Sequence, residues 1–291
     1  MVYKARHEES GRMVALKIQP AVDSRNERAG KRFEAEARAV DGVEHPNIVS
    51  VRDVGGWNGR PYLVTDWVDG WGLDVWMAQQ RTKAVVQRID EWDGAVAEAI
   101  RNAVRILSTV SRAVEHLHQC GIFHRDLKPS NILIDSRGEP HVSDFGVARR
   151  ADAADRLTWT GEVVGTPDFM SPEQARGEWD NGVFTADVFS LGAVLYWVLA
   201  ERPPFAGGNV MASLKRLAGP EEAEPIVRDG QRADRNLEAV ALKALRKRSR
   251  ARYQTAAELG DDLDCWLAGE AVRVRPRTLV ERLTGRRSRP A

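Results

Sequence analysis

The segment from His124 to Asn131, which reads HRDLKPSN, brings three chemically useful side chains together within six positions. They are the carboxylate of Asp126, the ammonium group of Lys128 and the amide oxygen of Asn131. A carboxylate accepts protons, an ammonium group neutralises negative charge, and carboxylate and amide oxygens bind hard divalent cations. The segment follows a helical pattern and precedes the apolar run 132–134, which predicts a loop between a helix and a strand.

A second oxygen ligand is expected at Asp144, which opens the sequence Asp-Phe-Gly thirteen residues after Asn131. In order and spacing, the two motifs resemble the catalytic loop and the metal-binding triplet of eukaryotic-type protein kinases. The alternative is a polar loop followed by a chance Asp-Phe-Gly. The flanking segments also match the family, which favours the kinase interpretation.

The composition sets limits on the class of protein. A chain of 291 residues, 43% apolar, can bury one large core or two adjoining lobes. Lys and Arg total 43 against 42 for Asp and Glu, so no nucleic-acid partner is expected. Cys120 and Cys265 have no metal-ligand or disulfide spacing, which favours a reducing, cytoplasmic location. The longest apolar run, 191–200, is shorter than the roughly 20 residues that span a bilayer, so no membrane span is expected.

The first part of the chain predicts a β-hairpin from the runs 2–7 and 12–18. Its second strand contains Val-Ala-Leu-Lys, which resembles the lysine-bearing strand of kinases. The resemblance implies that Lys17 binds the α- and β-phosphates of ATP and pairs with Glu36 on a helix over 25–41. A solvated strand-end lysine is the alternative for Lys17, and Glu34 is the less favoured alternative for Glu36.

An adenine pocket is implied around the segment 62–70, which runs from a buried strand into a glycine-containing linker. Six residues are expected to contact the base: Val2 and Ala15 above it, Leu133 below it, Thr65 at the back as gatekeeper, and Asp66 and Val68 through their backbone groups.

The activation segment is predicted to run from Asp144 to Glu173. It contains Gly-Thr-Pro and Met-Ser-Pro-Glu, similar to the end of this segment in serine/threonine kinases. Thr166, together with Lys128, matches the pattern of kinases that act on Ser and Thr hydroxyls. Arg125 is expected to pair with a phosphate on the candidate phosphosites, Thr158 or Thr160. For either threonine, an ordinary polar loop is the alternative.

The C-terminal half predicts helices over about 96–117, 188–200, 208–218, 235–247 and 255–268. Asp187 is expected to cap the start of the second of these helices, and the family implies that it also anchors the catalytic loop. Glu201 stands where the family has glycine. Arg252 is expected to pair with Glu173, although Arg248-Ser249 replaces the usual Asp-Pro.

The two ends of the chain depart from the family. Residues 271–291 contain seven arginines and one acid, Glu281, and resemble the juxtamembrane linker of bacterial receptor-type kinases. A disordered tail is an equal alternative. At the other end, the family has one more strand and a glycine-rich phosphate loop before the position of Val2. We therefore expect a natural start further upstream and weak clamping of the phosphates without it.

These observations predict an α+β, two-lobed protein-kinase fold of the bacterial serine/threonine type. The expected parts are an N-lobe over 1–68 with a small antiparallel sheet and one helix, a mainly helical C-lobe over 69–268, and a basic tail over 269–291. The expected reaction is transfer of the ATP γ-phosphoryl group to protein Ser or Thr hydroxyls. Asp126 and Lys128 would be catalytic, and Asn131 and Asp144 would hold Mg²⁺.

The expected partners are protein substrates and a second copy of the chain for trans-autophosphorylation. A kinase-like scaffold or truncated fragment that acts only by protein binding is the rival from another class. A small-molecule kinase is a weaker third option. The intact motif residues favour the enzyme, whereas the missing glycine-rich loop favours the scaffold.

Overall fold

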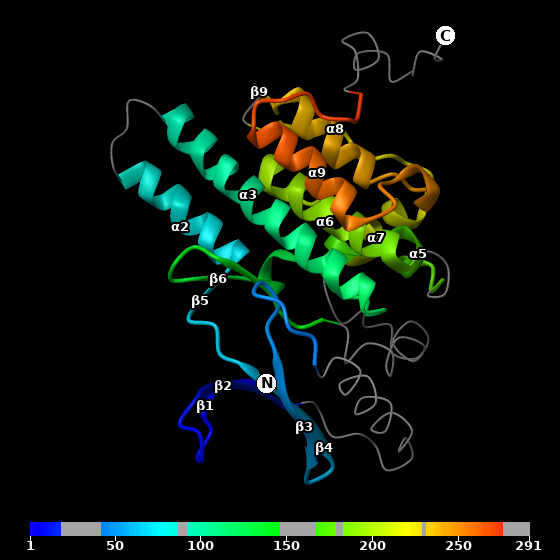
Figure 1. Ribbon diagram of the computed structural model, residues 1–291. Coiled ribbons are helices and arrows are strands. Elements are labelled where there is room, and N and C mark those ends of the chain that lie inside the picture. Colours follow the sequence, from blue (N-terminus) through cyan, green and yellow to red (C-terminus); the bar gives the residue numbers. More distant parts are fainter. Residues whose placement is uncertain (19–41, 87–91, 146–166, 179–182, 229–230, 276–291) are drawn as a thin grey trace.

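The chain folds into two lobes, as predicted, with a β-sheet lobe below a larger helical lobe in Figure 1. The computed structural model describes residues 1–18, 42–86, 92–145, 167–178, 183–228 and 231–275. The predicted helix over 25–41, with Glu36, therefore lies outside the described residues.

The smaller lobe contains an antiparallel sheet in the order β1-β2-β4-β3, built from Val2–Arg6, Met13–Ile18, Arg60–Asp66 and Val51–Trp57 respectively. The predicted hairpin of β1 and β2 is present, and its register places Val2 opposite Lys17. Asn58 and Gly59 join β3 to β4 with φ of 48° and 72°. Positive φ at both central residues suits a two-residue hairpin, which Asn-Gly favours.

The two lobes are joined by backbone pairing as well as by the linker. The segment around Ile48 forms a parallel bridge with Val142. The Val142 N–H donates to the Asn47 carbonyl at 2.8 Å, and the Val49 N–H donates to the Val142 carbonyl at 2.9 Å. Val142 belongs to β7 (Pro140–Val142), which pairs with β6 (Ile132–Asp135), and β6 also pairs with β5 (Gly70–Gly72). The small sheet that directly follows the catalytic loop is thus hydrogen-bonded, through β7, to the segment that leads into the smaller lobe.

Helices make up most of the larger lobe. They are α2 (Leu73–Val86), α3 (Trp92–Gln119), α5 (Pro172–Ala175), α6 (Val183–Ala200), α7 (Val210–Ala218), α8 (Arg235–Ala244) and α9 (Ala256–Leu267). Side chains of Asn209, Asp234 and Thr255 accept backbone N–H groups at the starts of α7, α8 and α9. Such N-caps satisfy donors that have no partner within the helix. Gly121, with φ of 73°, follows the end of α3, where a left-handed glycine commonly ends a helix.

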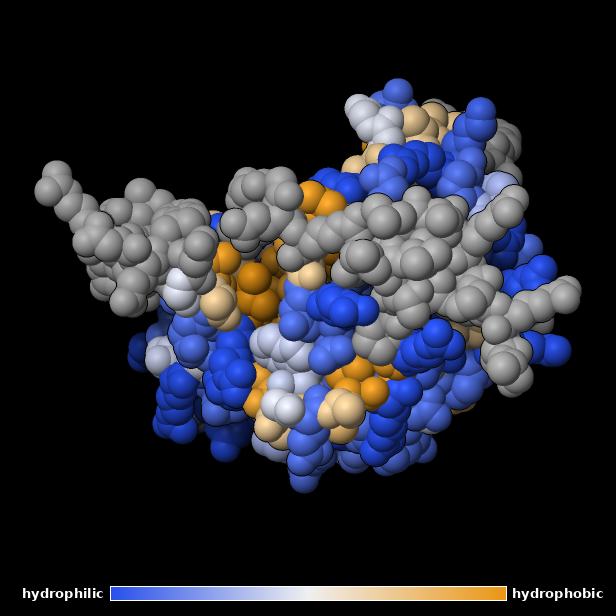
Figure 2. Space-filling view, turned by 90° about the horizontal axis from the view of Figure 1, so that it is seen from above, coloured by the Kyte–Doolittle hydropathy of each residue, from blue (hydrophilic) through white to orange (hydrophobic). Residues whose placement is uncertain are grey.

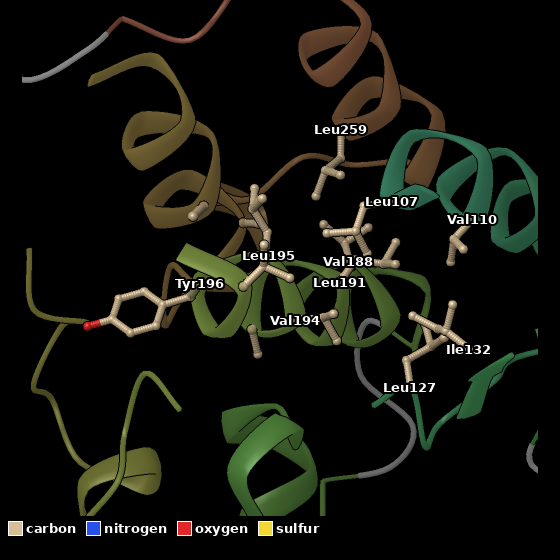
Figure 3. Close-up of a cluster of buried hydrophobic side chains, with 14 of the residues drawn as sticks. Leu107, Val110, Leu127, Ile132, Val188, Leu191, Val194, Leu195, Tyr196 and Leu259 are labelled. Atoms are coloured by element: carbon tan, nitrogen blue, oxygen red, sulfur yellow. The ribbon is translucent and has the colours of Figure 1, made fainter. Parts of the chain in front are cut away.

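Helix α6 runs through the centre of the helical lobe. Its sequence is apolar on nearly every side, and residues from Val188 to Leu199 are buried almost without interruption. Figure 3 shows its side chains meeting Leu107 and Val110 of α3 and Leu259 of α9. Leu127, inside the catalytic loop, and Ile132, immediately after it, lie in the same cluster. Burial of these two side chains attaches the loop to the core.

Several predicted boundaries differ from the structure. Helix α6 begins at Val183, so the expectation that Asp187 caps its start is wrong. The helix starts five residues earlier than predicted, which moves the Asp187 carboxylate from the helix end to its side. Helix α3 begins at Trp92 rather than near 96.

Residues just after α9 are attached to it, although we expected a tail from residue 269. The carboxylate of Asp262, which is fully buried, accepts the Arg273 N–H at 2.6 Å, the Val274 N–H at 3.3 Å and the Tyr253 hydroxyl at 2.6 Å.

Among the described helices, none is long and apolar enough to cross a bilayer. On the coloured surface in Figure 2, hydrophilic residues predominate and hydrophobic residues occupy smaller areas.

Candidate active site

Asp126 lies in the loop between α3 and β6, and its carboxylate is held by two neighbours. The Lys128 Nζ atom donates to Asp126 Oδ2 at 3.0 Å. The Asn131 Nδ2 atom donates to the Asp126 carbonyl at 2.8 Å and lies 3.4 Å from its Oδ2 atom. Asn131 belongs to the short 3₁₀ helix η2 (Pro129–Asn131), which turns the chain into β6. The structure thus brings together the three residues predicted from the HRDLKPSN segment.

The backbone of the loop is held from below by Asp187, a fully buried residue of α6. Its Oδ2 atom accepts the His124 N–H at 2.8 Å, and its Oδ1 atom accepts the Arg125 N–H at 2.8 Å. Arg125 has φ of 64°, an unfavourable conformation for a residue with a side chain. The two hydrogen bonds to one carboxylate help to hold the strained turn immediately before Asp126.

Asp187 also contacts His118 of α3, whose Nε2 atom lies 2.8 Å from Asp187 Oδ2. Burial alone would raise the pKa of Asp187. The hydrogen bond and charge interaction with His118, together with His124, outweigh this effect and keep the pKa below its usual value. The ionised carboxylate is the form that accepts hydrogen bonds from His118 and from the backbone N–H groups of His124 and Arg125.

His124 is fully buried, and its contacts define where its proton lies. Its Nδ1 atom accepts the Asp126 N–H at 3.2 Å, so Nε2 carries the proton and donates to the Ser143 carbonyl at 3.0 Å. Burial lowers the pKa of His124, and nearby acidic groups oppose this effect without reversing it. A neutral imidazole therefore connects the catalytic loop to the residue before Asp144.

Asp144 lies beside Asn131 because Ser143 ties their segments together. The Ser143 N–H donates to the Asn131 carbonyl at 2.9 Å, and the Ser143 hydroxyl donates to the same oxygen at 3.2 Å. Asp144 has φ of 58°. Phe145 is buried and packs edge-on against the His124 ring, with centroids 6.3 Å apart. The turn that presents Asp144 is thus strained and supported by a buried aromatic side chain.

The donor set around Asp144 and Asn131 fits Mg²⁺. Asn131 uses its Nδ2 atom within the loop, which leaves the amide oxygen for a metal ion, and Asp144 contributes a partly exposed carboxylate. Mg²⁺ binds to proteins through one or two such oxygens and takes its remaining ligands from phosphates and water. Within the described residues, no group of three or more His, Cys, Asp or Glu side chains could hold a metal ion.

Lys17 on β2 reaches this site from the other lobe. Its Nζ atom donates to Asp144 Oδ1 at 2.9 Å, and the two side chains are 31% and 38% exposed. The solvated strand-end lysine considered from the sequence is therefore not what the structure shows. The predicted contact with Glu36 falls on a residue outside the described part of the chain.

The residues expected around the adenine come from both sheets. Ala15 and Thr65 are cross-strand partners in the β2–β4 ladder. Leu133 on β6 lies between Gly72 and His141 in the other sheet. Val2 lies at the edge of the N-lobe sheet and is 57% exposed.

The linker residues differ in the use of their polar groups. The Asp66 N–H donates to the Ser50 carbonyl at 3.0 Å, and its carboxylate forms a bidentate ion pair with Arg52. In the described part of the chain, the backbone groups of Val68 make no hydrogen bond. Within that part of the chain, the Val68 N–H and carbonyl therefore have no hydrogen-bond partner.

The end of the activation segment is joined to the helical lobe by a buried ion pair. The Arg252 Nη1 and Nη2 atoms donate to the two carboxylate oxygens of Glu173 at 2.6 and 2.7 Å, and Arg252 also donates to three backbone carbonyls. This is the pair expected from the resemblance. Replacement of the usual Asp-Pro by Arg248-Ser249 does not prevent it.

A connection that was not predicted from the sequence involves Gln174 of α5, whose Nε2 atom donates to the Arg125 carbonyl at 3.0 Å. It joins α5 to the residue immediately before Asp126. A capping box with Ser171 was the available sequence signal, because Ser-x-x-Gln places a glutamine at the start of a helix. The candidate regulatory residues Thr158, Thr160 and Thr166 lie outside the described residues.

The sequence of the chain is similar to a known protein family and to several bacterial proteins. The family described as protein kinase domain matches residues 1–259. The chain is 38% identical over 267 residues to serine/threonine-protein kinase PknB of Mycolicibacterium smegmatis, covering 90% of this chain and 40% of that protein. It is 37% identical over 268 residues to PknB of Mycobacterium tuberculosis H37Rv, with the same coverage. It is 35% identical over 264 residues to a probable serine/threonine-protein kinase of Clostridium perfringens, covering 90% of this chain and 36% of that protein.

Proposed function

The chain belongs to the protein kinase domain family, and on that basis we propose that it transfers the γ-phosphoryl group of ATP to Ser and Thr hydroxyls of proteins. The chain spans about 40% of the length of the PknB relatives, so the substrates and partners of the whole protein are part of the proposal. The observation that carries it is the convergence of Asp126, Lys128, Asn131 and Asp144 with Lys17 from the opposite lobe.

Each of these side chains has one task in the proposed reaction. Asp126 orients the acceptor hydroxyl and takes its proton as the new O–P bond forms and the bond to the leaving ADP oxygen breaks. Lys128, which contacts the Asp126 carboxylate, neutralises charge on the group in transfer. Lys17 would exchange its contact with Asp144 for the α- and β-phosphates, and Glu36 would pair with it. Asn131 and Asp144 would hold Mg²⁺, which neutralises phosphate charge when bound.

The nucleotide base would be held mainly by the linker and two apolar surfaces. Val2 and Ala15 would cover one face of the adenine and Leu133 the other, while Thr65 closes the back. The backbone groups of Asp66 and Val68 would bind the polar edge. The Val68 N–H and carbonyl make no hydrogen bond to the described residues, which supports this assignment.

We further propose protein substrates, a second copy of the chain as the partner for trans-autophosphorylation, and action in the cytoplasm. The nearly equal numbers of basic and acidic residues, 43 and 42, give no support for a nucleic-acid partner. Arg125, held in a strained conformation beside Asp126, would bind phosphate on Thr158 or Thr160, and Thr166 would contact the catalytic group.

Transfer of radiolabel from γ-labelled ATP to a generic basic protein tests the proposal, with phosphoamino-acid analysis of the product. We expect Mg²⁺-dependent labelling on Ser or Thr, and strongly reduced labelling with Lys17→Met. A protein that binds partners but transfers no label in the presence of Mg²⁺ would instead be the kinase-like scaffold.

A further inference from the structure

We propose that Lys4 and Trp67 are positioning residues for the nucleotide, because their contact fixes the linker segment whose backbone would bind the base. The inference rests on the proposed function, in which Val68 binds the polar edge of the adenine. It arises from a contact between the first strand and the linker that the catalytic mechanism does not use. The Lys4 Nζ atom lies over the Trp67 ring, 4.6 Å from the ring centroid.

Lys4 reaches the linker across the sheet of the smaller lobe. It lies on β1 opposite Ala15 of β2, and Ala15 lies opposite Thr65 of β4. Side chains of directly opposite residues project from the same face of a sheet, so Lys4 shares a face with two residues expected around the adenine. Trp67 directly follows the last residue of β4. Because β2 lies between β1 and β4, the Lys4 side chain extends over β2 to meet the ring.

The contact is a cation–π interaction, in which an ammonium group is attracted to the negative face of an aromatic ring. Among aromatic side chains, that of Trp gives the strongest attraction. The Trp67 Nε1–H is buried and meets no hydrogen-bond acceptor in the part of the chain that the structure describes. The orientation of the ring therefore depends on packing and on the ammonium group of Lys4 over its face.

A second cation holds the linker from the opposite edge of the sheet. Arg52 of β3 forms the bidentate ion pair with Asp66, the residue before Trp67. The Asp66 N–H also donates to the Ser50 carbonyl at 3.0 Å. The strands β1 and β3 are the two outer strands of this sheet. Residues 66 and 67 are thus attached to both edges of the smaller lobe.

The chain is attached to the larger lobe almost immediately afterwards. Gly70 begins β5, which pairs with β6, and a Cβ atom at Gly70 would collide with the Ile134 carbonyl oxygen. Val68 and Asp69 are the two residues between these attached segments. Trp67 therefore sets the direction in which the chain enters the base-binding residue. A ring fixed by Lys4 pre-organises the backbone of Val68, which reduces the entropy lost on binding.

Nucleotide binding by Lys4→Met tests the inference, because methionine keeps an unbranched side chain without the charge. Displacement of a fluorescent ATP analogue measures dissociation constants for a non-hydrolysable ATP analogue with Mg²⁺ and for adenosine, which has no phosphates. We expect both to be weakened by about threefold to fivefold, as for loss of an exposed cation–π contact. Lys4→Arg should keep the wild-type affinity, because a guanidinium group also binds an aromatic face. In steady-state assays of Lys4→Met, KM for ATP should rise by the same factor while kcat stays unchanged.

Two further comparisons separate positioning from a general effect of charge. In a Trp67→Leu background, Lys4→Met should have no further effect on either dissociation constant. Arg6→Met is the matched control, because Arg6 lies on the same face of β1, two residues beyond Lys4 and opposite Met13. It removes a cation from that face and should leave both dissociation constants unchanged. Thermal unfolding of each variant identifies any loss of fold.

Four results would overturn the inference. They are unchanged affinity in Lys4→Met, an equal loss in Arg6→Met, the full effect of Lys4→Met when Trp67 is already replaced, and weaker binding of the ATP analogue without weaker binding of adenosine. The last result would mean that Lys4 contacts the phosphates directly. Failure of the wild type to bind either nucleotide would overturn the proposed function as well, so the two failures are distinguishable.

Discussion

The Oδ2 atom of Asp187 lies 2.8 Å from the backbone nitrogen of His124, although 63 residues separate them in the chain. The same carboxylate reaches the Arg125 N–H through its other oxygen. One buried side chain of α6 thereby holds the turn that leads into Asp126. The rigidity of the candidate active site depends on the core helix beneath it.

Replacing Asp187 by Asn should therefore damage both stability and turnover. An amide accepts only one of the two backbone N–H groups, so the variant should lose about 2 kcal/mol or more in the free energy of unfolding. We expect kcat to fall at least about tenfold, because Asp126 would be less well oriented. Urea unfolding and steady-state assays measure the two effects.

Asp261→Asn provides the matched control for that experiment. Asp261 forms ion pairs at 2.7 Å with Arg112 and Arg273 at partly exposed sites on the far side of the helical lobe. Its loss should cost at most about 1 kcal/mol and leave kcat unchanged. Equal effects of the two substitutions would contradict the role given to Asp187.

The pair of Glu173 and Arg252 should show a marked asymmetry. Breaking a buried ion pair costs about 3–5 kcal/mol, so Glu173→Gln should be strongly destabilising. Arg252→Met should be worse, because it also removes the hydrogen bonds from Arg252 to the Arg246, Thr185 and Lys247 carbonyls. In a double-mutant cycle followed by urea unfolding, the combined loss should be well below the sum. Additive losses would show that the two residues do not stabilise each other.

Stability should also depend on pH near neutrality because of His124. Its pKa is lowered by burial in the folded state, whereas the unfolded chain binds a proton near pH 6.5. Below that pH the unfolded state holds more protons, so the stabilisation is complete above about pH 6.5 and is lost as the pH falls.

The slope contributed by His124 should approach about 1.4 kcal/mol per pH unit. His45, whose pKa is lowered by burial and by His116, should add a smaller dependence of the same sign. Urea unfolding from pH 5 to 8 measures this slope. His124→Asn should reduce it, and an unchanged slope in that variant would rule out His124 as its source.

Activation by phosphorylation is expected at Thr158 or Thr160. Phosphate there would form charge-assisted hydrogen bonds with Arg125 and order the segment next to the catalytic loop. Mass spectrometry after incubation with Mg²⁺ and ATP should find the modified residue. The Thr158→Ala/Thr160→Ala double variant should then lose most activity, and full activity in that variant would exclude this form of control.

The motifs predicted the local chemistry because each lies within a few residues of sequence. The contacts of Lys128 and Asn131 with Asp126 follow from one short loop. The hairpin turn at Asn58-Gly59, which we did not predict, also carries its own signal in the sequence. The apolar character of 188–200 is likewise local, and it was enough to predict a helix there.

Long-range contacts could not be predicted in this way. The pairing of Lys17 with Asp144 spans 127 positions and depends on how the lobes close. The start of α6 was misplaced because residues 183–186 lack a strong helix signal, and an acid before an apolar run resembles an N-cap. The Gln174 contact and the docking of Val274 depend equally on tertiary packing.

The most direct test of the catalytic assignment compares Asp126→Asn with the wild type in two measurements on the same preparations. Isothermal titration with Mg²⁺ and a non-hydrolysable ATP analogue should give nearly equal dissociation constants, because Asp126 acts on the acceptor hydroxyl. Turnover of a phosphoacceptor protein should fall by about 10²–10⁴-fold, the usual cost of removing a general base. Equal turnover by the two proteins would contradict the assignment of Asp126 and, with it, the proposed phosphoryl transfer at this site.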